Sequence, residues 1–194
     1  RIEAEEVRVA TKYAGRVDEV LVDEGDVVQA GQVLARMDTA ELQASLAKAR
    51  AEVASAQQGI FEARADIAQK ESQLSLAQRQ LERANELVKN NNIAREQVDQ
   101  RKSERDVAEA ALAAAKSRLT SSERNVEAAQ AELDRIQVQI NDSVLKAPRG
   151  GRVQYRLAEP GEVLAGGDPV VTVLDLTDVY MTIFLPTPQA GLAF

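Results

Sequence analysis

The chain has 194 residues with no cysteine, no histidine and no tryptophan, and its formal net charge at pH 7 is −7. The missing cysteine and histidine exclude a disulfide framework and remove the commonest transition-metal ligand and general base. The acidic balance without a basic stripe argues against a nucleic-acid partner, and the 3% aromatic content is too small for a large core or an apolar cofactor pocket.

Residues 15–38, GRVDEVLVDEGDVVQAGQVLARMD, have the pattern of half a small β domain. Short alternating apolar runs predict strands, and Gly25 and Gly31 stand at tight turns between them, where a positive φ is needed. Residues 1–14 alternate similarly and predict strands that enter the same domain. One such half cannot bury its apolar face by itself, so the pattern predicts a second half elsewhere.

The β pattern is then interrupted by helix formers. Ala, Glu, Gln, Arg and Leu dominate, proline is absent from residues 40–140, and Gly59 is the one glycine there. Asp38, with Glu41 three residues later, fits the N-cap and the acidic third position of a helix. The sequence predicts helices over about residues 39–89 and 94–141.

Both predicted helices carry seven heptads, with large residues on one seam position and small residues on the other, as in coiled coils. Lys70, Arg101 and Arg105 interrupt the seam, and their stems can lie along it. The turn-forming KNNNIA separates equal legs, so we expect an antiparallel hairpin, each leg about 70 Å long at 1.5 Å per residue. The large residues are Leu46, Val53, Ile60, Ile67, Leu74, Leu81 and Val88, then Val98, Leu112, Leu119, Val126, Leu133 and Ile140.

The second β half follows the helices. GRVQYRLAEPGEVLAGGDPVVTVLD, residues 151–175, matches the first half at a spacing of 136 positions, with Gly161 at the place of Gly25 and Gly167 at the place of Gly31. Two matching copies predict two packed halves of one flattened sandwich. The predicted fold class is α+β: a β-sandwich made of two half motifs, with a long antiparallel coiled-coil hairpin inserted between them.

The two halves resemble the lipoyl/biotinyl carrier domain, with its G-x-V, E-G-D-x-V and G-x-x-L pattern, and VLKAPRGGRV resembles the A-P-x-x-G-x-V that opens its second half. In a carrier, the modified lysine lies on a tight hairpin between the halves. Here residues 39–143 follow Asp38 at that place, so lipoylation and biotinylation are not expected. A carrier domain of a multienzyme complex and a structural coiled-coil spacer stay open as alternatives.

A lipoyl-like domain with an inserted α-hairpin resembles the periplasmic adaptor proteins, also called membrane fusion proteins of the hemolysin-D type (HlyD family). The resemblance implies a lipoyl-like domain, or barrel-sandwich hybrid, from residues 1–38 and 144–176, and an α-helical hairpin from residues 39–143. It also implies that residues 177–194 are the start of a β-barrel domain, most of which is absent from this chain.

The resemblance implies a non-catalytic subunit of a tripartite efflux or secretion system that links an inner-membrane transporter to a TolC-like outer-membrane channel. It further implies a homo-oligomer, commonly a hexamer, in the periplasm, with an inner-membrane anchor that is not present in this chain. The long hairpin favours an ABC-type transporter over MFS-type and RND-type pumps. No phosphate loop, nucleophile elbow or metal cluster occurs, and the carboxylates lie on coil faces opposite the apolar seam, so we expect no catalytic residue, cofactor or metal.

The resemblance also implies docking residues at the hairpin tip. Adaptors of TolC-type channels share a motif of Arg, Leu four residues on, and Ser seven residues beyond; this chain has Arg83, Leu87 and, in place of Ser, Ala94. The tip turn is Asn90, Asn91 and Asn92. The connections between helix and sheet are the expected hinge, which comprises Asp38, Thr39, Asn141, Asp142 and Ser143.

Overall fold

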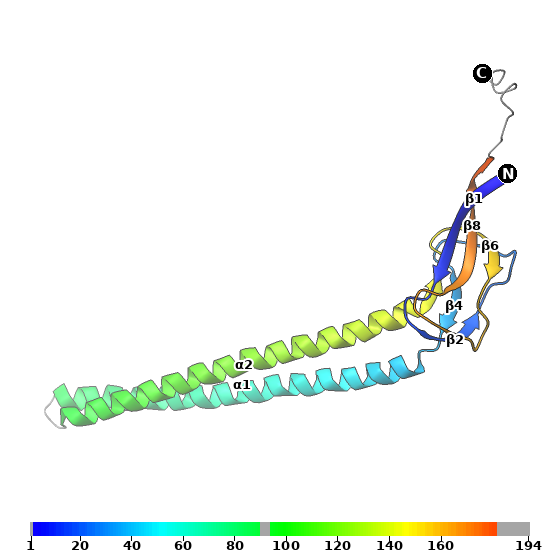
Figure 1. The fold of residues 1–194 in the computed structure, drawn as a ribbon. Coiled ribbons are helices and arrows are strands. Elements are labelled where there is room, and N and C mark those ends of the chain that lie inside the picture. Colours follow the sequence, from blue (N-terminus) through cyan, green and yellow to red (C-terminus); the bar gives the residue numbers. More distant parts are fainter. Residues whose placement is uncertain (1, 90–93, 182–194) are drawn as a thin grey trace, which may run out of the picture. The chain divides into compact units, whose positions relative to one another are not determined.

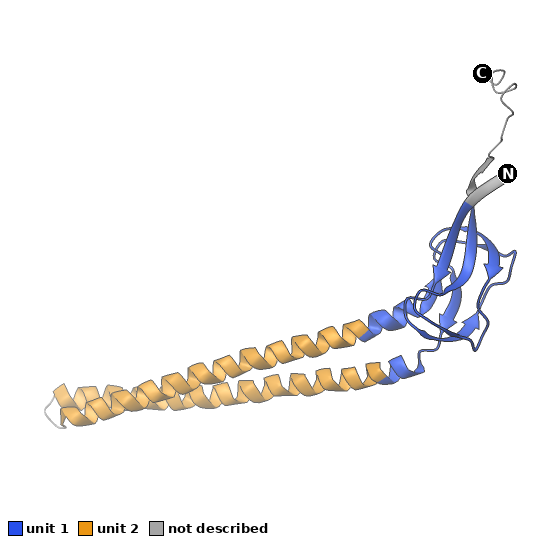
Figure 2. Ribbon diagram, viewed as in Figure 1, with its two compact units in different colours: residues 1–44, 136–194 blue, residues 45–135 orange. Residues whose placement is uncertain are grey.

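The computed structural model describes residues 2–89 and 94–181 (Figure 1). The chain divides into two compact units (Figure 2). Residues 1–44 and 136–194 form the first, which we call the sandwich unit, and residues 45–135 form the second, the hairpin unit.

The sandwich unit contains two four-stranded antiparallel sheets, ordered β1-β8-β6-β3 and β5-β4-β2-β7. Each sheet takes two strands from before the helices and two from after them. Neither half of the sequence therefore makes a sheet alone, and the predicted sandwich of two half motifs is confirmed. The strands are β1 (Ile2–Ala10), β2 (Gly15–Val20), β3 (Val27–Val28), β4 (Val33–Met37), β5 (Val144–Lys146), β6 (Gly151–Arg156), β7 (Val163–Leu164) and β8 (Pro169–Met181).

The internal repeat is visible as matched turns. Gly25 and Gly161 have φ angles of 93° and 90°, and the N–H of each donates to a strand of the opposite half, on Val153 (2.9 Å) and Val17 (2.8 Å) respectively. The second turn of each half likewise holds a glycine of positive φ. Because L side chains rarely adopt this backbone conformation, the same two turn positions require glycine in both copies.

The core of the sandwich is aliphatic. Its largest fully buried side chains are one leucine and six valines, all on strands, and each contributes about 1.5–3 kcal/mol by leaving water. The short β-branched side chains fit a thin space between two pleated sheets. The buried residues of this set are Leu34, Val17, Val28, Val153, Val170, Val171 and Val173.

The hairpin unit consists of parts of α1 (Ala40–Lys89) and α2 (Arg95–Asp142). The small seam position is buried along both helices, at Ala49, Ala77 and Ala84 of α1 and at Ala115 of α2, so the predicted coiled coil is confirmed. Small side chains at these places let the two backbones approach closely.

Charged side chains on the seam are met by carboxylates. Lys70 lies 3.9 Å from Asp66, and Arg118 of the other helix lies 3.6 Å from the same carboxylate. Arg105 pairs with Glu109 at 3.1 Å on its own helix. Lys70 and Arg105, two of the cations that interrupt the apolar pattern, are therefore each paired with a carboxylate of their own helix.

One element boundary differs from the simplest expectation. α1 begins one residue later than the Asp38 cap predicts, because Thr39 supplies the first helical acceptor, to the N–H of Gln43 at 2.8 Å. The Asp38 carboxylate still accepts a hydrogen bond from the N–H of Ala40 at 3.0 Å, although Asp38 lies one residue before the N-cap. It therefore satisfies one of the backbone N–H groups that have no partner within the helix. β8 extends through residues 177–181, of which Val179, Tyr180 and Met181 pair with β1; residues 182–194 lie outside the described residues, and the start of a β-barrel domain at residues 177–194 stays a prediction.

Candidate functional site

The tip candidates Arg83 and Leu87 lie one helical turn apart near the end of α1. Leu87 is 43% exposed, whereas Ala84 between them is buried on the seam. The Arg83 side chain is exposed, and its Nε donates to the carbonyl of Arg79 at 3.3 Å. Because the seam is filled by Ala84, the arginine and the leucine both face outward and present a charged and an apolar group side by side.

Ala94 is exposed immediately before α2. Its carbonyl accepts the N–H of Gln97 at 3.1 Å, so it stands at the N-cap, where a serine would also offer a side-chain acceptor. The predicted tip turn of Asn90, Asn91 and Asn92 lies outside the described residues.

The first hinge candidates join β4 to α1 and are hydrogen-bonded to the sheet. The Asp38 N–H donates to the Arg16 carbonyl at 2.8 Å, and Arg16 Nη2 donates to Asp38 Oδ2 at 2.6 Å. The Ala40 amide and the Arg16 guanidinium, which both donate to this carboxylate, hold the pKa of Asp38 below its ordinary value. Thr39 accepts a hydrogen bond from the Gln43 side chain at 3.0 Å.

The second hinge candidates join α2 to β5. Lys12 Nζ donates to Asp142 Oδ2 at 2.7 Å, and Asn141 accepts a hydrogen bond from Gln137. Ser143 is buried; its Oγ donates to the Gln139 carbonyl, and its own carbonyl accepts the Met37 N–H at 2.9 Å. Met37 and Ser143 thus stand opposite each other where a carrier domain would place its turn, and a helix end occupies each side. The hinge itself stays a prediction.

Sequence reasoning named the hinge carboxylates Asp38 and Asp142 but missed their partners Arg16 and Lys12. The pairs are separated by 22 and 130 positions along the chain, and no local pattern relates their members. Arg16 carried one usable signal, because the repeated Gly-Arg-Val places an arginine at the same point of both halves.

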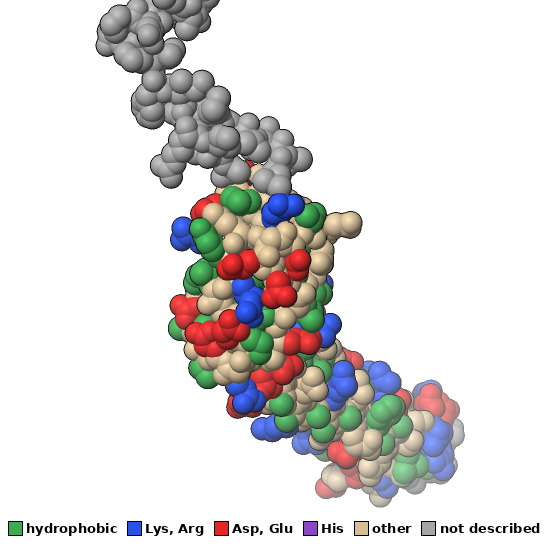
Figure 3. Space-filling model, turned by 90° about the vertical axis from the view of Figure 1, so that its right-hand side faces the viewer, with side chains coloured by type: hydrophobic (Ala, Val, Ile, Leu, Met, Phe, Trp, Pro, Cys, Tyr) green, Lys and Arg blue, Asp and Glu red, His purple; other side chains and the backbone are tan. Residues whose placement is uncertain are grey.

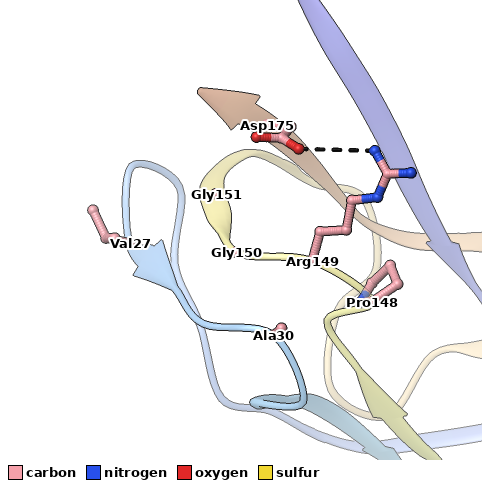
Figure 4. Close-up of a pocket in the computed structure, with 7 residues that line it drawn as sticks. All are labelled: Val27, Ala30, Pro148, Arg149, Gly150, Gly151 and Asp175. Carbon is pink, nitrogen blue, oxygen red and sulfur yellow. Dashed lines mark ion pairs between the residues drawn. The ribbon is translucent and has the colours of Figure 1, made fainter. Parts of the chain in front are cut away.

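A pocket of about 590 Å³ opens beside β3 (Figure 4). Its side walls are Val27, Ala30 and Pro148, with the backbone of two glycines, and its titratable lining groups in the described part of the chain are Arg149 and Asp175. The arginine is turned toward the carboxylate, 3.8 Å away (Figure 4). A cation engaged by a carboxylate and surrounded by aliphatic walls gives this pocket no free acid, base or nucleophile.

Two carboxyl groups of the coil also have pKa values below their ordinary values because they accept hydrogen bonds from neighbouring side chains. Hydrogen bonds from Arg101 and Gln100 lower the pKa of Glu104, and a hydrogen bond from Arg135 lowers the pKa of Glu132. Both groups are ionised acceptors on the surface of the coil, which is the role of a solvated ion pair and not that of a general acid.

The charged groups are distributed without a basic stripe on the face drawn in Figure 3, where acidic and basic side chains are interspersed and apolar side chains are scattered between them. Among residues 2–89 and 94–181, no cluster of three or more acidic, histidine or cysteine residues is suited to a metal ion. Within the same residues, neither long helix is apolar enough to cross a bilayer.

Comparison with known proteins finds no matching family model. A UPF0194 membrane protein of Yersinia enterocolitica is 30% identical over 198 residues, which are 89% of this chain and 60% of that protein. The chain therefore spans about 60% of the length of the curated relatives that it matches first.

Two solved structures share the architecture. MacA from Actinobacillus actinomycetemcomitans superposes with a TM-score of 0.66 at 20% identity, over 92% of this chain and 52% of that one. The periplasmic adaptor protein EmrA superposes with a TM-score of 0.54 at 19% identity, over 98% of this chain and 78% of that one. The chain has the periplasmic adaptor fold. The resemblance predicted from the two half motifs and the inserted helices is thereby confirmed at the level of the fold.

Proposed function

We propose that this chain is the periplasmic part of an adaptor subunit in a tripartite efflux or secretion system. It links an inner-membrane transporter to a TolC-like outer-membrane channel, and it has no catalytic role. The observation that carries this proposal is the exposed Arg83–Leu87 pair, one charged and one apolar group on the outer face of α1 beside the tip. Arginine offers five donors in a fixed geometry, which suits carbonyls or carboxylates of a partner.

The adaptor fold supports the rest of the assembly by analogy. The subunit forms a ring, a hexamer in the full complex, held in the periplasm by an inner-membrane anchor. The 50 and 48 residues of α1 and α2 make a long hairpin, and this length favours an ABC-type transporter as the inner-membrane partner.

Site-specific photo-crosslinking tests the docking surface. A photoreactive residue at position 87, in cells that produce the whole protein, should crosslink to an outer-membrane channel. The matched control is position 76, because Leu76 is a leucine of α1 with a similar exposed fraction, 47% against 43%, but lies between three and four turns before the end of the helix. Equal crosslinking at both positions, or crosslinks to no outer-membrane protein, would contradict the proposal.

The substitution Ala94→Ser is expected to tighten docking. A serine hydroxyl at this N-cap can accept the N–H of Gln97, and such a cap stabilises a helix end by about 1 kcal/mol, or about five-fold in affinity if the ordered tip is the binding form. Co-purification of the channel with the whole adaptor measures the change. Ala94→Val is the control, since it alters the side chain without adding an acceptor; equal recovery with serine and valine would show that capping does not limit docking.

A further inference from the structure

The segment of residues 11–16, which we call the latch segment, is firmly seated in the sandwich. Thr11 is 3% exposed; its N–H donates to the Asp168 carbonyl at 2.9 Å, its Oγ1 donates to the Ala165 carbonyl at 2.7 Å, and its carbonyl accepts the N–H of Gly167 at 2.7 Å. At its other end, Gly15 pairs with β7. A segment bonded at both ends holds its charged side chains in defined places.

Two of those side chains contact residues at or next to the ends of the two long helices that join the sandwich. We call residues 40–43 of α1 and 139–143 at the end of α2 the helix roots. Lys12 contacts Asp142, the last residue of α2, at 2.7 Å, and Arg16 contacts Asp38, just before α1, at 2.6 Å. The four residues all belong to the sandwich unit. One short segment therefore forms an ion pair at each of the two junctions where the hinge is predicted.

The Lys12–Asp142 pair also offsets an unfavourable charge at the C-terminal end of α2. The last turn of α2 carries Asp142 and no basic residue, so its negative charge adds to the negative end of the helix dipole. Lys12 supplies the missing cation from outside the helix, and its ammonium lies 5.6 Å from the centre of the Tyr13 ring as well. The hydrogen bond to Asp142 raises the pKa of Lys12, so the ammonium stays charged.

The equivalent segment of the second half has the same kind of contact. The loop between β5 and β6, shifted by 136 positions from the latch segment, carries Arg149, which pairs with Glu5 of β1 at 2.8 Å and lies 3.8 Å from Asp175 of β8 (Figure 4). Glu5 and Asp175 are directly opposed across these strands. In the second half one basic residue thus holds the two neighbouring strands β1 and β8, whereas in the first half two basic residues hold one helix end each.

We propose that the latch segment controls the hinge: the Lys12–Asp142 and Arg16–Asp38 pairs hold the last turn of α2 and the first turn of α1 against the sandwich, and the junctions bend only when these pairs are open. The device is independent of what the hairpin tip binds. Its contacts are half-exposed ion pairs, with side chains between 30% and 61% exposed, so it is weak enough to open and is sensitive to salt.

Hydrogen–deuterium exchange on the whole protein tests the latch. In Lys12→Ala, amide exchange in residues 139–143 should rise by about three-fold, and in Arg16→Ala the same rise is expected in residues 40–43. In the double variant, exchange should rise by about ten-fold in both segments. In the wild type, 0.5 M NaCl should move the rates toward those of the double variant. The charge swap Lys12→Asp with Asp142→Lys should restore slow exchange at the root of α2, which separates pairing from loss of one side chain.

The matched control is Arg149→Ala, which removes the equivalent contact of the other half. It should raise exchange around Glu5 and Asp175 and leave the helix roots unchanged. Unchanged exchange at the roots in the double variant, or an equal rise there in Arg149→Ala, would overturn the proposal. The readout does not depend on channel binding, so it stands or falls separately from the proposed function.

Discussion

Replacing Gly151 with alanine is expected to destabilise the sandwich by about 3 kcal/mol or more, whereas the same change at the equivalent Gly15 should cost less than about 1 kcal/mol. A Cβ at position 151 would collide with the carbonyl oxygen of Leu174 and lie 2.9 Å from a Val173 methyl group. At position 15 the nearest atom is the terminal methyl of Met37 at 3.5 Å, an ordinary contact with a flexible side chain.

The difference arises because the obstacle at Gly151 is backbone. Leu174 lies on β8, which is paired with β1 on one side and with β6 on the other, so its carbonyl cannot move without opening the sheet. At Gly15 the contact already has an ordinary van der Waals length, so no group has to move.

Urea unfolding followed by tyrosine fluorescence measures the effect. The chain has no tryptophan, and its three tyrosines, Tyr13, Tyr155 and Tyr180, all belong to the sandwich unit, so this signal reports the sandwich and not the coil. Far-ultraviolet circular dichroism would be dominated by the two long helices. Equal midpoints for the two variants would show that the sheet yields at β8, and would contradict the steric argument.

The second large effect is expected at the tip. If the exposed Arg83–Leu87 pair is the docking surface, Arg83→Ala and Leu87→Ala should each weaken binding of the outer-membrane channel by about ten-fold or more, and the double variant by about a hundred-fold. Arginine is enriched among the few residues that carry most of the binding energy in protein interfaces, and burial of the leucine side chain adds apolar area.

Binding to the purified channel in a lipid nanodisc, by surface plasmon resonance, gives the affinities. Leu76→Ala is the matched control, because it truncates a leucine of similar exposure on the same helix and should leave the affinity within about two-fold. The variants change exposed side chains, so the coil should keep its melting temperature. If Leu76→Ala lowered the affinity as much as Leu87→Ala, binding would involve the helix along its length, and the proposal that the tip is the docking surface would be contradicted.

Much of the architecture can be predicted from local sequence patterns. Heptads at Leu46, Val53 and Ile60 predict a helix with one apolar stripe, and the repeated spacing of Gly25 and Gly31 at Gly161 and Gly167 predicts two copies of one β unit. Periodicity and turn chemistry act over a few residues, so one sequence is enough to read them. The exposed character of Leu87 follows in the same way, since Ala84 takes the seam position beside it.

The sequence by itself therefore determined the kind of units: two β halves and a coiled-coil insert. Only the tertiary structure decided that each sheet mixes strands of both halves, that Gly151 and not Gly15 is pressed against a carbonyl, and that Lys12 meets Asp142. These contacts join residues far apart in the chain, and they depend on backbone positions that no spacing rule encodes. They exist because burying one shared aliphatic core brings the two halves together, and that burial places the loops, the glycines and the helix roots beside one another.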